Sequence, residues 1–291
     1  MEYFHSLLHY DEVHINNNNF IHLYEITKHD KDKFKIFLNK LKSDELLTSL
    51  SISSNVFYHK NINQVINALS KNKNFKELNV SFNTSFKLRH IKSLNLLKNE
   101  YKNIYMRLYF LNKQNLKNQD LLLFLKSHLI DEIYVKYLDF QFLINSLIKN
   151  NNIINLYFFD EEFNIDYSLS KTLSTNTSIK RLDFSLIKNK EIGCLESLQQ
   201  ILSNNKSINI LDLSNKEIDL FLIFDIMHNK NNITSLILDN CKIIDSIPFL
   251  QIIRENEQLI SLSLVNNPIK DIDYLVDEVE NHVNRDFELI I

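Results

Sequence analysis

The sequence is poor in glycine, proline and tryptophan. Its 291 residues include one glycine, Gly193, two prolines, Pro248 and Pro268, and no tryptophan. Phosphate-binding loops need glycine, because only glycine lets the backbone N–H groups approach a phosphate closely. With one glycine, neither a Walker loop nor a dinucleotide-binding fingerprint can be written in this chain. The composition therefore argues against a kinase, an NTPase or a Rossmann dehydrogenase.

Cysteine and long apolar runs are also scarce. The two cysteines, Cys194 and Cys241, lie far apart in the sequence and are expected to be reduced, buried thiols. Residues 1–10 lack the basic start and apolar core of a signal peptide. Apolar runs such as residues 121–125 are too short to span a bilayer. We therefore expect a soluble, cytoplasmic protein.

The charge of the chain is nearly balanced, and asparagine is abundant. The 36 acidic residues exceed the 33 basic residues by three, which gives no reason to expect a nucleic-acid or membrane partner. Asparagine is the ordinary residue that best tolerates the left-handed turn conformation that glycine usually adopts. Asparagine is therefore expected to replace glycine in the turns of this protein.

A repeated apolar pattern runs through the C-terminal third of the sequence. Residues 208–213, 233–238 and 259–264 share the pattern LxxLxL with isoleucine or leucine at its start. Three residues after each pattern comes a small or polar residue: Lys216, Cys241 or Asn267. The patterns are about 25 residues apart, within the range of leucine-rich repeats.

Weaker copies of the pattern extend toward the N-terminus. They lie at residues 179–184, 153–158, 130–135, 101–106, 75–80 and 47–52, and a first copy at 10–15 is less certain. Short asparagine-rich turns precede most of them. Together these segments predict about ten repeats over nearly the whole chain.

The LxxLxLxx(N/C)xL pattern resembles that of ribonuclease-inhibitor-like leucine-rich-repeat proteins. The resemblance implies an α/β solenoid shaped like a horseshoe, with a parallel sheet on the concave face and helices on the convex face. We expect one domain, residues 1–291, with an N-terminal cap at 1–46, repeats at 47–269 and a C-terminal cap at 270–291. The asparagine-rich chain is also similar to leucine-rich-repeat effectors of intracellular bacteria.

Helical apolar spacing fills the segments between the predicted strands. Stripes of apolar residues at this spacing are Ile62, Val65, Ile66 and Leu69; Leu88, Ile91, Leu94 and Leu97; and Ile192, Leu195, Leu198 and Ile201. A charged helix with Phe34, Phe37, Leu38 and Leu41 is expected in the N-terminal cap. A short strand at residues 287–289 is expected to close the array.

Aromatic residues occupy the exposed position of the central repeats. In LxxLxL the named apolar residues point into the core, so the positions between them face solvent on the sheet. Tyr105, Tyr134 and Tyr157 take the central exposed position in three consecutive repeats. If Leu108 and Phe110 are the core pair instead, Tyr109 replaces Tyr105 in this ladder.

The ladder and its neighbours form the predicted protein-binding surface. Tyrosine and arginine dominate binding hot spots, and soluble proteins seldom expose a large apolar patch without a use. An aromatic ladder that only stabilises the sheet remains an alternative. Leu108 is also exposed in this register, while the charges at positions 180, 181, 183, 212 and 239 are read as a solvated rim. The predicted binding residues are Phe82, Tyr105, Arg107, Tyr134, Lys136, Tyr137, Tyr157, Phe159, Asp183 and Asp212.

No arrangement of residues predicts catalysis, a metal site or a cofactor. His5 and His9 have the i, i+4 spacing of two metal ligands, but no cysteine or HExxH pattern accompanies them. Cys241 occupies the Asn/Cys position of its repeat and is expected to be a buried residue that caps backbone groups. We therefore expect no enzyme, no cofactor and no metal.

The favoured hypothesis is a monomeric module that holds another protein in its concave face. By analogy with the ribonuclease-inhibitor-like family, it would inhibit an enzyme by covering the active site. As an effector it would act in the host cytosol, on a host protein or on a second effector. The alternatives are a cytoskeletal or regulatory scaffold that binds through the convex face or the ends, and an enzyme that uses these repeats for recognition.

Overall fold

The computed structural model describes most of the chain in two compact units, residues 1–146 and 147–291. The described residues are 12–15, 19–22, 31–43, 45, 48–53, 62–82, 105–110, 122–123, 125, 130–135, 140–148, 151–158, 165–187, 195–228, 232–282 and 286–291.

The N-terminal unit contains a mixed sheet with the strand order β2-β1-β3-β4-β5-β6. Strands β3 to β6 are parallel, and β1 is antiparallel to both β2 and β3. The elements are β1 (Glu12–Ile15), β2 (Asn19–His22), α3 (Lys31–Ser43), β3 (Ser49–Ser53), α4 (Ile62–Leu69), β4 (Glu77–Phe82), β5 (Tyr105–Phe110), β6 (Ile130–Val135) and α7 (Phe140–Leu147), in which the boundary between the units falls.

The first copy of the repeat pattern, at residues 10–15, is a strand but not a parallel repeat. Its strand β1 forms a hairpin with β2 and pairs with β3 in the antiparallel direction. The reading of this segment as the first repeat was therefore wrong. Apolar alternation predicts a strand but not its direction, because the side chains of parallel and antiparallel strands alternate in the same way.

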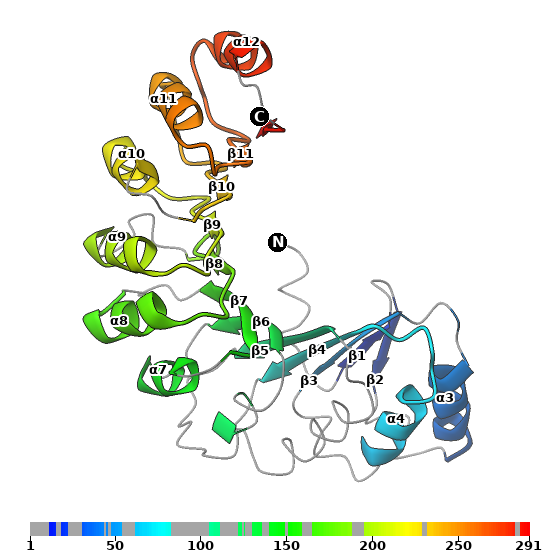
Figure 1. The fold of residues 1–291 in the computed structure, drawn as a ribbon. Helices are drawn as coiled ribbons and strands as arrows, with labels where there is room; N and C mark the ends of the chain where they lie inside the picture. The colour runs from blue at the N-terminus through cyan, green and yellow to red at the C-terminus, as the bar shows by residue number, and fades with distance from the viewer. Residues whose placement is uncertain are drawn as a thin grey trace. The chain divides into compact units, whose positions relative to one another are not determined.

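The C-terminal unit is a regular alternation of parallel strands and helices. Its strand order is β7-β8-β9-β10-β11-β12, and Figure 1 shows helices α8 to α12 stacked along one side of these strands. The elements are β7 (Ile153–Phe158), α8 (Tyr167–Thr175), β8 (Arg181–Asp183), α9 (Leu195–Asn204), β9 (Ile210–Asp212), α10 (Leu220–His228), β10 (Ser235–Ile237), α11 (Ile247–Glu255), β11 (Ser261–Ser263), α12 (Ile272–His282) and β12 (Glu288–Ile290).

This architecture confirms the predicted α/β solenoid of the leucine-rich-repeat kind. The described chain contains ten parallel strands, β3 to β12, and helices follow the strands. The strand predicted at residues 287–289 is β12, which pairs in parallel with β11. The helix stripe predicted at residues 62–69 coincides with α4, and the stripe at 192–201 falls in α9 from Leu195 onward, its first residue being outside the described ranges, as is the whole stripe at 88–97.

The core of each unit is made by the apolar positions of the repeat. Leu156, Leu182, Leu211, Leu236 and Leu262 are aligned across β7 to β11, and each is fully buried. A single repeat cannot bury its own residue of this column, so each repeat depends on its neighbours for stability. In the N-terminal unit Leu50, Leu78 and Met106 form a corresponding column.

Asparagine side chains close the turns that follow the helices. Asn205 donates from its amide to the carbonyl oxygens of Leu173 and Asn176 in the preceding repeat, at 2.6 and 2.7 Å. Its Oδ1 accepts the backbone N–H groups of Ser207 and Ile208. Such bonds satisfy the carbonyl groups left over at a helix C-terminus. Similar bonds are made by Asn72, Asn176 and Asn256.

Asparagine also takes the left-handed positions that glycine usually occupies. Asn215, Asn240 and Asn266 have φ angles of 65°, 57° and 59°, and each comes directly before the Asn/Cys position of its repeat. Their equivalence in three consecutive repeats explains how the chain turns after each strand with a single glycine in the sequence.

The Asn/Cys position is occupied by three different side chains, of which two are buried and Asn267 is partly exposed. Asn267 donates to the carbonyl oxygens of Leu238 and Leu264, both at 2.8 Å. Cys241 is buried and its Sγ donates to the carbonyl oxygen of Leu213, as the sequence predicted. Lys216 is also fully buried, and its Nζ donates to the carbonyl oxygen of Ile187. All three therefore satisfy backbone groups of the preceding repeat or of their own.

Among the described residues, no helix combines the length and the apolar composition needed to cross a membrane.

Candidate functional site

The sheet of each unit has a face opposite its core, here called the sheet face, and both sheet faces carry a polar cluster. The N-terminal cluster consists of Glu77, Tyr105, Arg107, Glu132 and Tyr134. It stands on three neighbouring strands, because Tyr105 is aligned with Glu77, and Arg107 with Glu132. Alternation along β5 places Tyr105 and Arg107 on one face and the buried Met106 and Leu108 on the other.

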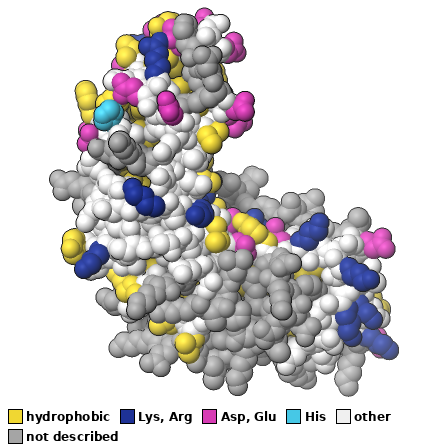
Figure 2. All heavy atoms as spheres, viewed as in Figure 1, with side chains coloured by type: hydrophobic (Ala, Val, Ile, Leu, Met, Phe, Trp, Pro, Cys, Tyr) yellow, Lys and Arg dark blue, Asp and Glu magenta, His cyan; other side chains and the backbone are white. Residues whose placement is uncertain are grey.

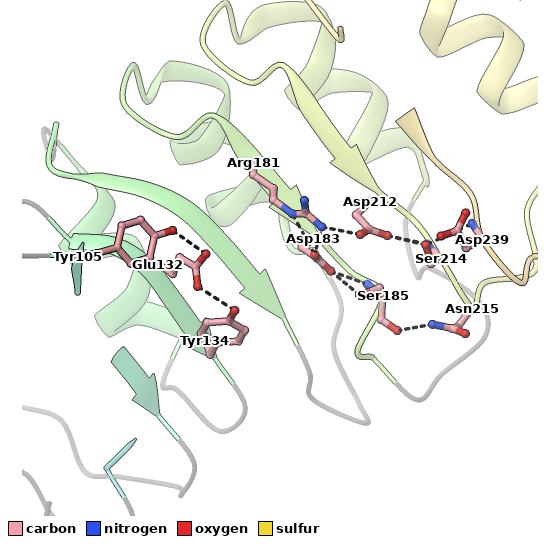
Figure 3. Close-up of polar contacts among 10 residues, drawn as sticks. All are labelled: Tyr105, Glu132, Tyr134, Arg181, Asp183, Ser185, Asp212, Ser214, Asn215 and Asp239. Carbon is pink, nitrogen blue, oxygen red and sulfur yellow. Dashed lines mark hydrogen bonds and ion pairs between the residues drawn. The ribbon is translucent and has the colours of Figure 1, made fainter. Parts of the chain in front are cut away.

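Glu132 is the centre of the N-terminal cluster. Its carboxylate accepts the hydroxyl of Tyr105 at 2.8 Å, the hydroxyl of Tyr134 at 2.9 Å and the Nε–H of Arg107 at 2.6 Å. Figure 3 shows the carboxylate lying between the two tyrosine hydroxyls. Arg107 also donates to Glu77 through its Nη1. A carboxylate with charge-assisted bonds on both oxygens is held firmly, although Glu132 is 93% buried (7% exposed).

Arginine and tyrosine are stacked at this cluster. The guanidinium carbon of Arg107 lies 4.8 Å from the ring centre of Tyr105, within the range of a cation–π contact. Both residues are partly exposed. Burial and the hydrogen bond to Glu132 raise the pKa of the Tyr105 hydroxyl to about 12. The hydroxyl therefore remains a donor to Glu132 across the physiological pH range.

The register of β5 decides which tyrosine joins the ladder. Tyr109, not Tyr105, is aligned with Tyr134, and their rings stack with centres 4.3 Å apart and planes 17° from parallel. The alternative, in which Leu108 and Phe110 are the core pair and Tyr109 replaces Tyr105 in the ladder, is therefore confirmed. Tyr109 is buried, and this burial raises its pKa to about 12. The placement of Tyr105 in the ladder was wrong, because Tyr105 lies opposite Glu77.

Leu108 was expected on the exposed face and is fully buried instead. It is aligned with Val80 on one side and with Ile133 on the other, and both of these residues are buried. Because five of the six residues of β5 are apolar or aromatic, its sequence is compatible with two core frames, and the exposed frame could not be chosen from the sequence.

The C-terminal cluster consists of Tyr157, Arg181, Asp183 and Asp212. Tyr157, Asp183 and Asp212 occupy the same position of β7, β8 and β9. Arg181 Nη2 donates to Asp183 and to Asp212, at 2.7 Å in both cases, so one guanidinium bridges two carboxylates (Figure 3). The same guanidinium lies 5.4 Å from the ring centre of Tyr157. This unit therefore repeats the arginine–tyrosine pairing of the N-terminal cluster.

Serine residues two positions along the chain complete the shell of the two aspartates. Asp183 Oδ1 accepts the backbone N–H and the hydroxyl of Ser185, and Asp212 Oδ1 accepts the same two groups of Ser214. In the next repeats Asp239 Oδ1 accepts the hydroxyl of Ser263 at 2.6 Å. In Asp183 and Asp212, the motif Asp-x-Ser therefore holds one carboxylate oxygen and leaves the other oxygen for Arg181.

Asp183 and Asp212 carry two negative charges and form ion pairs with the same guanidinium, that of Arg181. Asp183 and Asp212 are both buried and compete for one guanidinium. Burial, followed by the charge of Asp183, raises the pKa of Asp212 to about 6. Burial opposes the charge of Arg181, but the carboxylates of Asp183 and Asp212 outweigh it and raise the pKa of Arg181 above its ordinary value.

The predicted binding residues fall into three groups in the structure. Tyr105, Arg107, Tyr134 and Tyr157 are partly exposed on the sheet faces. The expectation that Asp183 and Asp212 are solvated rim charges was wrong, because both are buried under the Arg181 bridge. Phe82 pairs with Phe110 in the sheet, but its side chain is outside the described residues, as are Lys136, Tyr137 and Phe159.

Three residues of the clusters were not predicted from the sequence. Glu77 and Glu132 precede a core residue of their strands, where a carboxylate is usually solvated, and Arg181 was read as a rim charge. The signal that could have identified them is register: in the aligned repeats Arg107 faces Glu132, and Arg181 lies two positions before Asp183, on the same face of β8. An arginine and a carboxylate in adjacent strands favour an ion pair on the sheet.

Two candidate kinds of reactive group can be assessed among the described residues. Burial raises the pKa of the Cys241 thiol to about 11, which removes the thiolate that a nucleophile needs. Within the described ranges, no group of three histidine, cysteine or acidic residues has a geometry for a metal ion. The candidates His5, His9 and Cys194 lie outside those ranges. The clusters themselves can offer aromatic rings, a fixed guanidinium and hydrogen-bond acceptors to a partner.

No family model matches the chain, and none of the curated proteins compared with it matches either.

Proposed function

We propose that this protein is a non-enzymatic binding module that holds another protein on its sheet faces. The observation that carries the proposal is the pair of preorganised arginine–tyrosine contacts, Arg107 with Tyr105 and Arg181 with Tyr157. Arginine and tyrosine are enriched among the residues that dominate binding energies. Each unit presents one such pair, partly exposed, on the sheet face.

The buried carboxylates support this proposal because they remove conformational freedom before binding. Glu132 holds Arg107, Tyr105 and Tyr134, and the two aspartates hold Arg181. Immobilising a long side chain at an interface costs about 0.5–1.5 kcal/mol. A side chain that is already fixed in the free protein avoids most of this cost on binding. The clusters are therefore suited to recognition by a rigid surface.

The resemblance of the repeats to ribonuclease-inhibitor-like proteins extends the proposal to a mechanism. A partner enzyme bound over its active site would be excluded from its substrate, so the module would act as an inhibitor. As a bacterial effector, or as a regulator of another effector, the protein would work in the cytoplasm, including the host cytosol. It would be a monomer before it binds its partner. These steps rest on the likeness of the repeat pattern alone.

A double substitution on the sheet faces tests the proposal. The protein with Tyr134→Ala and Tyr157→Ala is compared with the wild type in affinity capture from a native lysate, with the retained proteins quantified by mass spectrometry. We expect one specific protein to be lost from the double variant, since truncation of a hot-spot residue costs about 2 kcal/mol or more, roughly a 30-fold loss of affinity.

A matched control separates the sheet faces from the helices. Ile36→Ala combined with Tyr167→Ala removes one exposed apolar side chain of a helix from each unit, where these residues are 67% and 69% exposed. The control is expected to retain the partner. Loss of the partner in the control, with retention in the Tyr134/Tyr157 variant, would instead support the scaffold that binds through its helices.

A further inference from the structure

Three consecutive repeats of the C-terminal unit place an aspartate at the start of their helices. Asp219 and Asp271 stand directly before α10 and α12, Asp245 stands two residues before the first residue of α11, and each is 26 residues after the one before. Asp219 Oδ1 accepts the backbone N–H of Phe221 at 2.9 Å, and Asp245 Oδ1 accepts that of Ile247 at 3.0 Å. An aspartate that accepts an N–H group two residues later fixes the start of a helix.

The same helix starts expose large apolar side chains. Phe221 is 87% exposed, Ile247 66% and Tyr274 52%. They belong to the first turn of α10, α11 and α12, respectively, so they form a row across neighbouring repeats that we call the helix-start row. Phe221 is the most exposed of the large apolar residues in the described chain. An apolar row of this kind on a soluble protein usually serves binding.

A hollow lies within the helix-start row. Its volume is about 630 Å³, and it is lined by Ile244, Asp245, Ile247, Lys270, Asp271 and Tyr274. The hollow therefore lies between the starts of α11 and α12. Apolar side chains and polar groups line it together, the polar ones being those of Asp245, Ser246, Lys270 and Asp271, so it can receive an apolar side chain whose neighbours are charged.

Negative charge surrounds the helix-start row. Exposed carboxylates at these three helix starts belong to Glu217, Asp219, Asp245, Asp271 and Asp273, whereas the exposed ammonium groups there belong to Lys242 and Lys270. Lys242 Nζ is already 3.2 Å from Glu217. Figure 2 shows acidic and apolar side chains intermingled over the surface formed by these repeats. An acidic, apolar surface attracts a ligand that is both basic and apolar.

We infer that the helix-start row is a second docking surface, for a segment of another protein that combines apolar side chains with lysine or arginine. Two other occupants fit the charges less well. Two copies of this chain, docked through the same row, would bring five carboxylates against five. An anionic membrane would be repelled by the same carboxylates. The surface is distinct from the sheet faces, because it is built on helices.

The geometry also favours an extended segment. Packed helices lie about 8–10 Å apart, so the row offers one apolar side chain at about this interval. An extended chain advances about 3.3–3.6 Å per residue, and every third residue therefore meets the next helix start. The partner segment would carry an apolar residue about every third position, with basic residues between.

Differential selection of peptides tests this inference. Random 12-residue peptides displayed on phage are selected on the full chain, and those retained equally by the Phe221→Ser/Ile247→Ser variant are discarded. We expect the remaining peptides to be enriched at least twofold in lysine and arginine and in apolar residues. The most frequent peptide, measured by fluorescence anisotropy, is expected to bind the wild type at least tenfold more tightly than the variant.

Charge variants and a control complete the test. Asp219→Asn/Asp245→Asn keeps side chains that cap helices well, and it is expected to weaken the peptide at least threefold at low salt, with the difference shrinking in 0.5 M salt. Ile36→Ser, at an exposed position of α3, is expected to bind like the wild type.

Three results would overturn the inference. The first is a selection that yields acidic or charge-neutral peptides, or no peptide that distinguishes the variant. The second is a wild-type dimer in sedimentation velocity that Phe221→Ser/Ile247→Ser converts to a monomer. The third is binding of vesicles containing phosphatidylserine that depends on Phe221.

Discussion

The two arginine clusters share a design but differ in how their charge is balanced. In the N-terminal unit, Arg107 lies between Glu77 and Glu132, and Glu132 is also satisfied by two neutral tyrosine hydroxyls. In the C-terminal unit, Arg181 forms ion pairs with both buried aspartates, whose other oxygens accept serine donors. The two tyrosine hydroxyls stabilise the buried carboxylate of Glu132 without a second cation. In the C-terminal cluster, where serine hydroxyls donate to the aspartates, the pKa of Asp212 is raised.

The comparison implies different sensitivities. The N-terminal cluster depends on the single side chain of Glu132, because two tyrosine hydroxyls and the guanidinium of Arg107 converge on it. The C-terminal cluster depends on the positive charge of Arg181 and on the protonation of Asp212. Both clusters fix an arginine against a tyrosine ring, but only the second is expected to respond to pH.

The largest effect is expected for Glu132→Ala in the N-terminal unit. This substitution leaves the Tyr105 and Tyr134 hydroxyls without their acceptor and Arg107 with one carboxylate in place of two. Breaking a buried pair on one side costs about 3–5 kcal/mol. Urea unfolding should show a loss near the lower end of this range, since Arg107 keeps Glu77. Glu45→Ala, at an exposed position, serves as the control, and a loss below about 1 kcal/mol for Glu132→Ala would remove its central role.

The next effect is expected for Arg181→Ala in the C-terminal unit. Without the guanidinium, Asp183 and Asp212 are two buried carboxylates that have lost their shared ion-pair partner, and we expect a loss of about 2–3 kcal/mol in urea unfolding. Adding Asp212→Asn removes one of the two charges and should restore part of this loss. If the double variant is as unstable as Arg181→Ala, the repulsion between the aspartates is not what Arg181 relieves.

A smaller effect separates the two clusters by pH. The pKa of Asp212 is raised from an ordinary 3.8 to about 6, so the folded state binds a proton that the unfolded state has released. The stability that Asp212 contributes is therefore present below about pH 4 and is lost as the pH rises to about 6. Relative to Asp212→Asn, the wild type should lose about 2 kcal/mol between pH 4 and pH 7.5, since one pKa unit corresponds to about 1.4 kcal/mol.

The control for this pH dependence is Asp277→Asn, an exposed position of α12. Relative to this control, the wild type should show a constant difference over the same pH range. A constant difference for Asp212→Asn as well would mean that Asp212 is ionised throughout and that Arg181 balances both aspartates.

The smallest effect is expected for Tyr134→Phe. This change keeps the ring stacked on Tyr109 and removes one of the three donors to Glu132. Loss of one hydrogen bond to a charged group costs about 1.5 kcal/mol or less, because two donors remain. Thermal unfolding should therefore show a shift smaller than that of Glu132→Ala. A shift equal to that of Glu132→Ala would mean that Glu132 stabilises the fold entirely through its hydrogen bond with Tyr134.

The fold could be predicted because it depends on a pattern that is local and repeated. The LxxLxL spacing identified β3, β4 and β6 to β11 as strands, and the asparagines at 215, 240 and 266 occupy the left-handed turns expected of them. Strand direction is a property of the connection between strands, so the antiparallel hairpin of β1 and β2 was beyond the reach of the pattern.

The clusters were predicted only in part, and for two physical reasons. The apolar run of β5 fits two frames, so Tyr105 and Tyr109 could not be distinguished without the partner strand. Charged side chains on a strand are normally solvated, so Glu132, Asp183 and Asp212 were read as exposed or passed over. Their burial depends on an arginine from the same or a neighbouring strand, which a single repeat does not reveal.

Photo-crosslinking tests most directly whether the sheet face holds the partner. The amino acid p-benzoylphenylalanine is placed at Tyr157 on the sheet face or at Tyr167 in α8 of the same unit, and each protein is irradiated in a native lysate. Binding on the sheet face predicts one specific adduct from position 157 and none of it from position 167. The same adduct from position 167, with nothing from position 157, would contradict it.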